Sequence, residues 1–178
     1  IRQAVPAIHH VAQELGRWQA ASRCVQIGSV PSGCFMITQT IVNSYKRGLL
    51  EGAFNFSSTT TQVFKIALYT SAANLNADTT VYSTTNESSG TGYTAGGQVL
   101  TISTNPTLAN NVAFMSFATV TWAVTSITAR GALIYKLDGV TNPAIAVLDF
   151  GEDKTTSSGN FVINFPLADF QNAIVRSA

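Results

Sequence analysis

The feature that most constrains the fold is a repeated alternation of apolar and polar residues with a period of two. In QVFKIALYT (62–70), Phe64, Ile66 and Leu68 fall on one side of an extended chain and their neighbours on the other. In FATVTWAVT (117–125) the same period places Ala118, Val120, Trp122 and Val124 together. Successive side chains of a β-strand point to opposite faces of its sheet, so both segments are predicted to be half-buried strands, with Trp122 in the core.

Further short apolar segments follow at regular intervals. They cover 127–137, 144–150, 160–165 and 173–176, and turn-rich links separate them: DGVTNP, GEDKTTSSG and PLADFQN. A parallel α/β sheet would need helices between its strands, whereas short strands joined by turns are typical of sandwiches and barrels. We therefore predict an all-β fold, either a two-sheet sandwich or a jelly roll.

One amphipathic helix is expected before the strands. In TIVNSYKRGLLEGAF the apolar residues recur at helical spacing and Gly52 provides a stop signal; they are Ile41, Val42, Tyr45, Leu49 and Leu50. Residues 36–178 are thus predicted to form a single β domain with a leading helix.

The composition changes at Met36. Both cysteines and both histidines precede it, and the Ser/Thr-rich β-type sequence follows it. Residues 1–35 have two interpretations. They form an N-terminal arm, in which Val11, Leu15 and Trp18 make an apolar stripe on a short helix, or they are an upstream translated segment ahead of a start at Met36.

Charge is scarce and balanced. Charged residues make up 11% of the chain, the formal net charge is +1, and Lys and Arg form no run. The long-range attraction on which nucleic-acid binders and anionic-membrane binders depend is therefore weak. We predict neither nucleic acid nor membrane as a partner.

The residues from Met36 onward offer few catalytic groups. They contain no Cys or His, which excludes there the usual nucleophile–base pairs and zinc sites. Asp149, Glu152 and Asp153 form the one acidic cluster, but its spacing is not that of a calcium loop, and we interpret it as a solvated hairpin mouth partly neutralised by Lys154. The sequence predicts no enzyme activity, no catalytic residue, no metal and no cofactor.

A glycine-rich stretch, GTGYTAGG, contains a nucleotide-motif spacing at Gly90, Gly92 and Ala95. That motif works between a buried strand and a helix, and here a polar run precedes it and a β-type segment follows. We interpret it as part of a long surface loop covering 74–97, because loops of this length are commonly functional or mobile. Tyr82, Asn86 and Tyr93 are its candidate contact residues, since tyrosine is favoured at interfaces.

Two basic residues on one predicted strand, Arg130 and Lys136, are candidate ligand contacts. Their i, i+6 spacing puts them on the same face. An outward polar edge explains this pattern better, because long basic side chains usually keep their charge in water.

Several long strings have a familiar pattern. The string FKIALYTSAANLNADTTVYSTTNESSGTGYTAGG, followed by ARGALIYK, AVLDFGEDKTTSSGNFVINFP and NAIVR, resembles a group of small tailed-bacteriophage proteins encoded among virion structural genes. The resemblance runs from about residue 40 to the C-terminus, and members typically begin near NSYKRGLLEG. It carries no catalytic motif and no assigned binding residue.

The resemblance implies a non-enzymatic structural protein located in the virion. Two roles fit: a capsid decoration or cement protein that stabilises the head, or a tail or tail-fibre component, including a carbohydrate-binding β-module. The expected partners are the major capsid protein or tail proteins, together with further copies of the chain, because closed symmetry is the usual solution for homo-oligomers.

Overall fold

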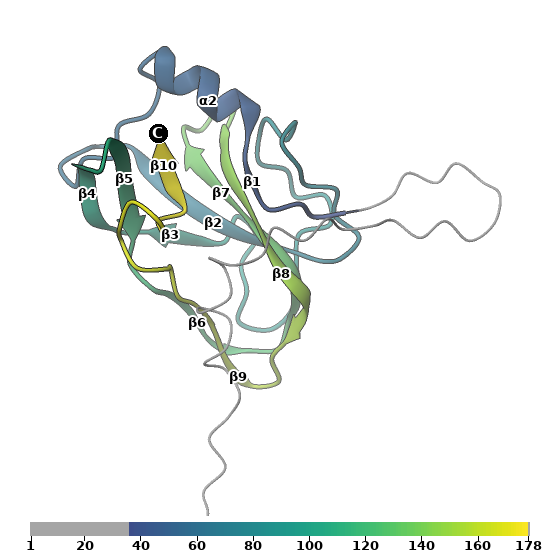
Figure 1. The fold of residues 1–178 in the computed structure, drawn as a ribbon. Helices are drawn as coiled ribbons and strands as arrows, with labels where there is room; N and C mark the ends of the chain where they lie inside the picture. Colours follow the sequence, from purple (N-terminus) through teal and green to yellow (C-terminus); the bar gives the residue numbers. More distant parts are fainter. Residues whose placement is uncertain (1–35, 178) are drawn as a thin grey trace, which may run out of the picture.

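The computed structural model describes residues 36–177 and has, within that range, one short helix and ten β-strands (Figure 1). The two interpretations of residues 1–35 therefore lie outside the described residues. The elements are β1 (Thr40–Ile41), α2 (Asn43–Leu50), β2 (Val63–Tyr69), β3 (Gln98–Leu100), β4 (Ile102–Ala109), β5 (Val112–Phe117), β6 (Val120–Thr125), β7 (Thr128–Leu137), β8 (Ala144–Thr155), β9 (Gly159–Ile163) and β10 (Val175–Ser177).

The strands form three antiparallel sheets. The largest has the order β1-β8-β7-β2-β3, a second has the order β10-β5-β4, and β6 pairs with β9. The prediction of an all-β fold with one leading helix is confirmed at this level.

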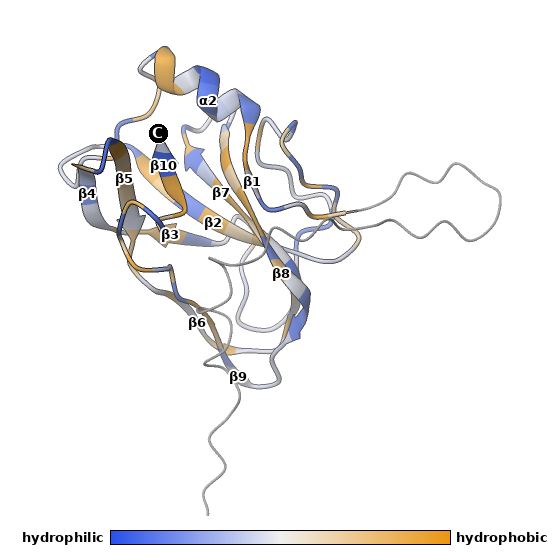
Figure 2. Ribbon diagram, in the orientation of Figure 1, coloured by the Kyte–Doolittle hydropathy of each residue, from blue (hydrophilic) through white to orange (hydrophobic). Residues whose placement is uncertain are grey.

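The centre of the five-stranded sheet is buried on both faces. Every residue from Gly131 to Tyr135 in β7 and from Ala144 to Leu148 in β8 is buried, and Figure 2 shows the hydrophobic colouring of these strands. We call one face the Ile66 face, which carries Phe64, Ile66 and Leu68 of β2. The opposite Lys65 face carries Lys65, Ala67 and Tyr69, because neighbouring side chains of a strand alternate.

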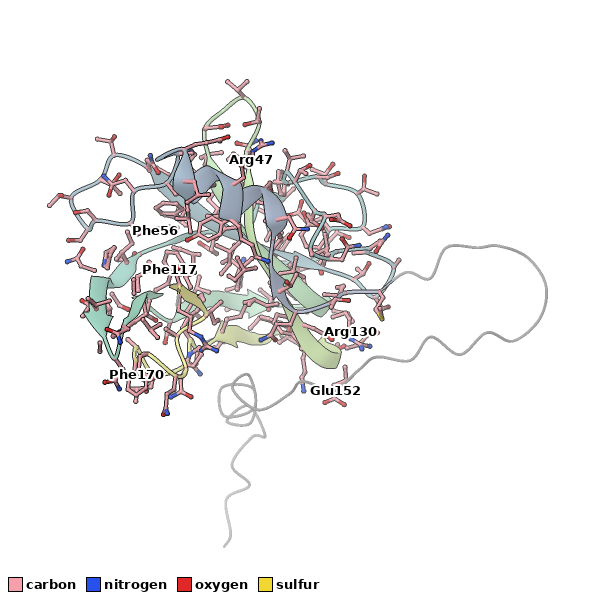
Figure 3. The ribbon with its side chains drawn as sticks, turned by 45° about the horizontal axis from the view of Figure 1, so that its top comes forward. Arg47, Phe56, Phe117, Arg130, Glu152 and Phe170 are labelled. Atoms are coloured by element: carbon pink, nitrogen blue, oxygen red, sulfur yellow. The ribbon has the colours of Figure 1, made fainter. Side chains whose placement is uncertain are left out.

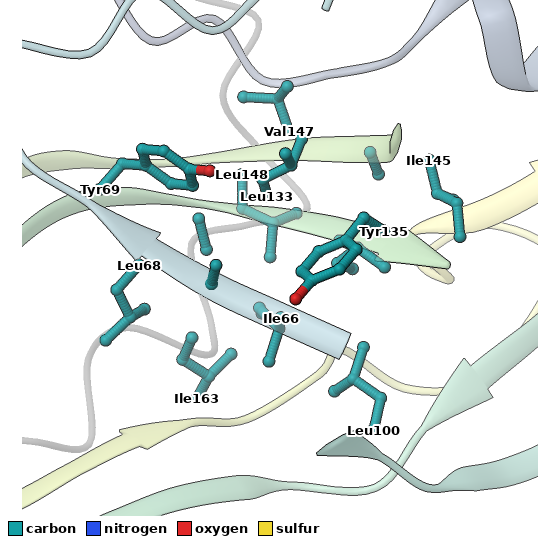
Figure 4. Packing of buried hydrophobic residues seen from close by; sticks show 14 of the residues in the cluster. Ile66, Leu68, Tyr69, Leu100, Leu133, Tyr135, Ile145, Val147, Leu148 and Ile163 are labelled. Atoms are coloured by element: carbon teal, nitrogen blue, oxygen red, sulfur yellow. The ribbon is translucent and has the colours of Figure 1, made fainter. Parts of the chain in front are cut away.

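The two faces are covered by different parts of the chain. Figure 4 shows Leu100 and Ile163 on the Ile66 side of β2. The segment between β2 and β3 covers much of the Lys65 face: Tyr82 stacks on Tyr135, with ring centroids 4.5 Å apart. Because both faces of the sheet are covered, the middle parts of β7 and β8 are apolar at every position instead of at every second one.

Aromatic rings connect the sheets on the Ile66 face. Phe56 stacks on Phe64 at 4.6 Å, Phe64 lies 6.1 Å from Phe117, and Phe117 lies 5.6 Å from Phe165. Figure 3 shows Phe56 and Phe117 beneath α2. Because these rings come from β2, β5 and the segments after α2 and β9, one apolar cluster joins all three sheets.

The helix is shorter than its apolar spacing indicated. Ile41 belongs to β1, and the helix begins at Asn43. Tyr45 and Gly48 form its buried side, whereas Leu50 is 92% exposed. Leu49 and Leu50 were expected on the apolar side, but Gly48 is the residue that packs there against Phe54, and Leu49 is exposed as well.

The segment predicted as one strand over 117–125 is two strands. β5 ends at Phe117 and β6 begins at Val120. Within β6 the pairing with β9 is irregular between Trp122 and Thr125, so Thr125 is buried and Val124 is 65% exposed. Trp122 is a core residue as predicted, 1% exposed and edge-on to Phe161.

Candidate functional site

Within residues 36–177, the segment from 70 to 97 is the longest stretch without extended strands, and it contains the three predicted contact residues. It is attached along its length to the five-stranded sheet and to β6. Single β-bridges join Tyr69 to Glu87, Val81 to Pro143 and Thr91 to Ser126. The expected surface loop is therefore an ordered layer held by backbone hydrogen bonds.

A carboxylate organises this layer. Glu87 accepts hydrogen bonds from the Tyr82 hydroxyl at 2.6 Å, the Tyr93 hydroxyl at 2.6 Å and the Gly96 backbone N–H at 2.7 Å. Hydrogen bonds to an ionised acceptor are about twice as strong as neutral ones. We call these four residues, with Tyr135, the Glu87 cluster.

The tyrosines connect the cluster to the sheet. The Tyr93 hydroxyl accepts from the Leu68 N–H at 2.9 Å, and Tyr135 donates to the Gly96 carbonyl at 2.8 Å. Burial raises the pKa of Tyr135 to about 12, and it raises the pKa values of Tyr82 and Tyr93 further. These hydroxyls therefore stay protonated at neutral pH and serve as donors.

The three candidate contact residues occupy different environments. Tyr82 and Tyr93 are half-buried with their hydroxyls directed at Glu87, whereas Asn86 is exposed. Asn86 adopts φ 60° and donates from its side chain to the Ala72 carbonyl at 2.9 Å. Their role in contacting a partner stays a prediction, and the two rings also have an internal role that spacing alone did not indicate.

The glycines of the nucleotide-like spacing serve close backbone packing. A Cβ on Gly90 would lie 2.2 Å from the Ser126 carbonyl oxygen, and one on Gly92 would lie 2.7 Å from that of Val124. The motif is followed by β3 and not by a helix, so no helix N-terminus faces it.

Asp149, Glu152 and Asp153 were expected in the turn of a hairpin. They lie within β8 instead, because this strand continues to Thr155. Asp149 accepts from Arg130 Nε at 3.2 Å, and Lys154 lies 2.6 Å from Glu152 and lowers the pKa of that carboxyl. Figure 3 shows Arg130 and Glu152 in this region, away from α2. Neutralisation by Lys154 is as predicted.

The basic residues of β7 are both bound within the chain. Arg130 pairs with Asp149, and Lys136 donates to the Ala53 carbonyl at 2.9 Å while its ammonium lies 5.2 Å from the centre of the Phe54 ring. The register shifts near these residues come from extra residues in β8, and β7 pairs one-for-one with β2 from Gly131 to Leu137.

One basic residue differs from the others. Residues 36–177 contain seven basic side chains, and six bind acceptors of the same chain: Lys46, Arg47, Arg130, Lys136, Lys154 and Arg176. The seventh, Lys65, is half-buried and forms no hydrogen bond or ion pair within the described range. Sequence analysis missed it, because its place in an alternating strand resembles an ordinary solvent-facing lysine.

Comparison with known proteins gives no relative: no family model, no curated protein and no solved structure matches this chain. In the described part of the chain, no three His, Cys, Asp or Glu side chains gather as a metal site would require. Within residues 36–177, no helix has the length and apolar character needed to cross a bilayer.

Proposed function

We propose that this protein is a non-enzymatic structural protein of a tailed-phage virion, most simply a capsid decoration protein that stabilises the head. The resemblance over residues 40–178 suggests this class. Its partners would be the major capsid protein or tail proteins, and its own copies.

The observation that carries a structural role is how the chain uses its carboxylates. Glu87 holds three donors of the layer over the sheet, Asp138 caps the β7–β8 turn with four hydrogen bonds, and Asp149 and Glu152 pair with cations. Groups that would do acid–base chemistry elsewhere are bound in hydrogen bonds and ion pairs that fix the backbone. This supports a protein that acts through a rigid surface.

We also propose that the three sheets make a two-layer sandwich of the jelly-roll type. The five-stranded sheet would form one layer. The β10-β5-β4 and β6-β9 sheets together would form the other and would pack against its Ile66 face. The aromatic contacts from Phe64 to Phe117 and Phe165 support this arrangement.

The test is to purify phage particles that carry this gene and to count the protein by quantitative mass spectrometry. Hundreds of copies, located on the head by cryo-electron microscopy, are expected, and particles lacking the gene should release DNA at a lower temperature. A dozen or fewer copies confined to the tail would favour a tail component. No copies in the particle would refute both roles.

A further inference from the structure

The β6-β9 pair is a two-stranded sheet with an unpaired side on β9. β9 pairs with β6 alone, and no backbone hydrogen bond joins residues 159–163 to any other part of residues 36–177. Figure 1 shows the two strands at the lower end of the molecule. The N–H and C=O groups of every second residue of β9 therefore point away from β6 without a strand beside them. We call this side the β9 edge.

The side chains of β9 hold the strand in place. Phe161 and Ile163 are buried, and the Phe161 ring lies 6.0 Å from the ring of Phe150 on β8. Asn160 and Val162 alternate with them on the outer face, where Asn160 is exposed and Val162 is half-buried. The core therefore fixes the direction in which the β9 edge faces.

The other strand edges in residues 36–177 have features that prevent pairing between molecules. The part of β8 beyond its pairing with β1 carries the charged run Glu152–Lys154, and β4 contains Pro106 and two register shifts. β1, β3 and β10 have only two or three residues each. Charges, proline, irregular register and short length are the usual protections of an edge strand. β9 has five residues, no charge and no proline, and the extra residue in its pairing with β6 belongs to β6.

The partner that fits this edge is β9 of a second copy. Antiparallel pairing of two identical strands is symmetric about a two-fold axis, and such isologous contacts close at two copies. β9 has no charged side chain and the whole chain has a formal net charge of only +1, so like charges do not oppose the contact in any register. The order β6-β9-β9-β6 makes one four-stranded sheet, whereas a two-stranded sheet is marginal on its own.

We propose that this protein forms a symmetric dimer in which the β9 edges of two copies pair as antiparallel strands. Backbone hydrogen bonds supply the affinity when a strand is added to the edge of a sheet. The dimer does not depend on a virion, so it is tested separately from the proposed function.

Hydrogen exchange tests the β9 edge directly. Amide exchange of the full-length chain is followed residue by residue by NMR at a series of concentrations, and sedimentation velocity gives the fraction of dimer in the same samples. The outward-facing N–H groups of β9 should exchange fast in the monomer and become protected in proportion to the dimer fraction. The N–H groups that face β6 should be protected at every concentration.

Two lysine variants test the position of the contact. Val162→Lys adds a like charge beside the edge in both copies and should weaken the dimer at least roughly tenfold. Thr121→Lys is the matched control, because Thr121 is the cross-strand partner of Val162 and lies on the same face. It is one strand further from the two-fold axis, so its charges in the two copies are roughly 10 Å further apart, which exceeds the screening length of about 8 Å. Its dissociation constant should stay near that of the wild type.

Circular dichroism first checks that both variants are folded, and the exchange experiment decides without any variant if Val162→Lys is not. Three outcomes would overturn the proposal. A wild type that stays monomeric at every concentration would leave the β9 edge unpaired. A monomer whose outward-facing β9 amides are already protected would show that another segment of the same chain covers the edge. A dimer that protects no β9 amide, or that Thr121→Lys weakens as much as Val162→Lys, would place the interface elsewhere.

Discussion

At the scale of single residues, the polar groups near the Lys65 face are specialised in opposite ways. Glu87 is saturated with donors from its own chain, and Lys65, on the same face, has no acceptor there. Burial of a polar group without a partner is unfavourable, so the three hydrogen bonds that Glu87 accepts stabilise the layer over the sheet, whereas Lys65 is half-buried and makes no such contribution.

Glu87→Gln should destabilise the folded protein by about 1–3 kcal/mol, because an amide oxygen is a weaker acceptor and the NH₂ that replaces the other oxygen meets a donor, either the Tyr82 hydroxyl or the Tyr93 hydroxyl and the Gly96 N–H. Urea unfolding followed by circular dichroism measures this change. Glu51→Gln is the control: it removes an exposed i, i+4 pair with Arg47 and should cost less than about 0.5 kcal/mol. Equal losses in the two variants would show that Glu87 is not an organising residue.

Stability should also fall in alkali. The pKa of Tyr135 is raised to about 12, whereas an unfolded tyrosine titrates near about 10. Below pH 10 both states keep the proton and the stabilisation is complete. Between pH 10 and about 12 only the unfolded state loses the proton, so stability decreases as the pH rises. Urea midpoints across this range should fall less steeply for Tyr135→Phe, and an unchanged slope would contradict the assignment.

At the scale of elements, the close approach of the 70–97 layer depends on glycine. Gly97 has φ 65°, and a Cβ there would lie 1.8 Å from the Ile66 carbonyl oxygen. Gly52 has φ 70° and nothing within 4 Å of its Cβ position. Both glycines have a left-handed backbone, but only Gly97 also lies in close contact with a neighbouring strand. Comparing substitutions at the two positions therefore distinguishes the effect of backbone strain from that of the steric contact.

Gly97→Ala should therefore destabilise much more than Gly52→Ala. Both substitutions carry the left-handed backbone cost of about 1–2 kcal/mol, and only the first must also move a strand. We expect a difference of at least about 2 kcal/mol in chemical unfolding. Similar values for the two variants would mean that the layer can lift away from β2 at little cost.

The elements that sequence analysis predicted are those with a visible period or length. β2, β7, β9 and most of β8 were predicted because their apolar runs are bounded by turn residues. β4 was missed because ISTNPTLA is largely exposed, contains Pro106 and does not alternate; only its pairing with β5 reveals it. β5 was missed because Phe114 to Phe117 are all buried, which removes the alternation.

The Glu87 cluster could not be predicted for a related reason. Its members are separated by up to 53 positions, from Tyr82 to Tyr135, and they meet through strand register and stacking. The sequence did indicate Tyr82 and Tyr93 as notable residues. The direction in which their hydroxyls point depends on the register of β2 and β7, which local patterns do not contain.

At the scale of the whole molecule, the aromatic cluster makes the three sheets interdependent. Phe117 contacts Phe56, Phe64 and Phe165, which come from three different segments of the chain. A domain of this size with one continuous core is expected to unfold in a single cooperative transition. Far-ultraviolet and near-ultraviolet circular dichroism should then give coincident unfolding curves.

Phe117→Ala tests this coupling. It leaves a cavity where the sheets meet, so we expect a loss of about 3–5 kcal/mol with both curves shifted together. Phe170→Ala is the matched control, because Phe170 is half-buried outside the ring cluster (Figure 3), and it should cost no more than about 1–2 kcal/mol. If Phe117→Ala separates the two curves, the β10-β5-β4 sheet unfolds independently of the five-stranded sheet, and the molecule is two cooperative units joined by weak contacts.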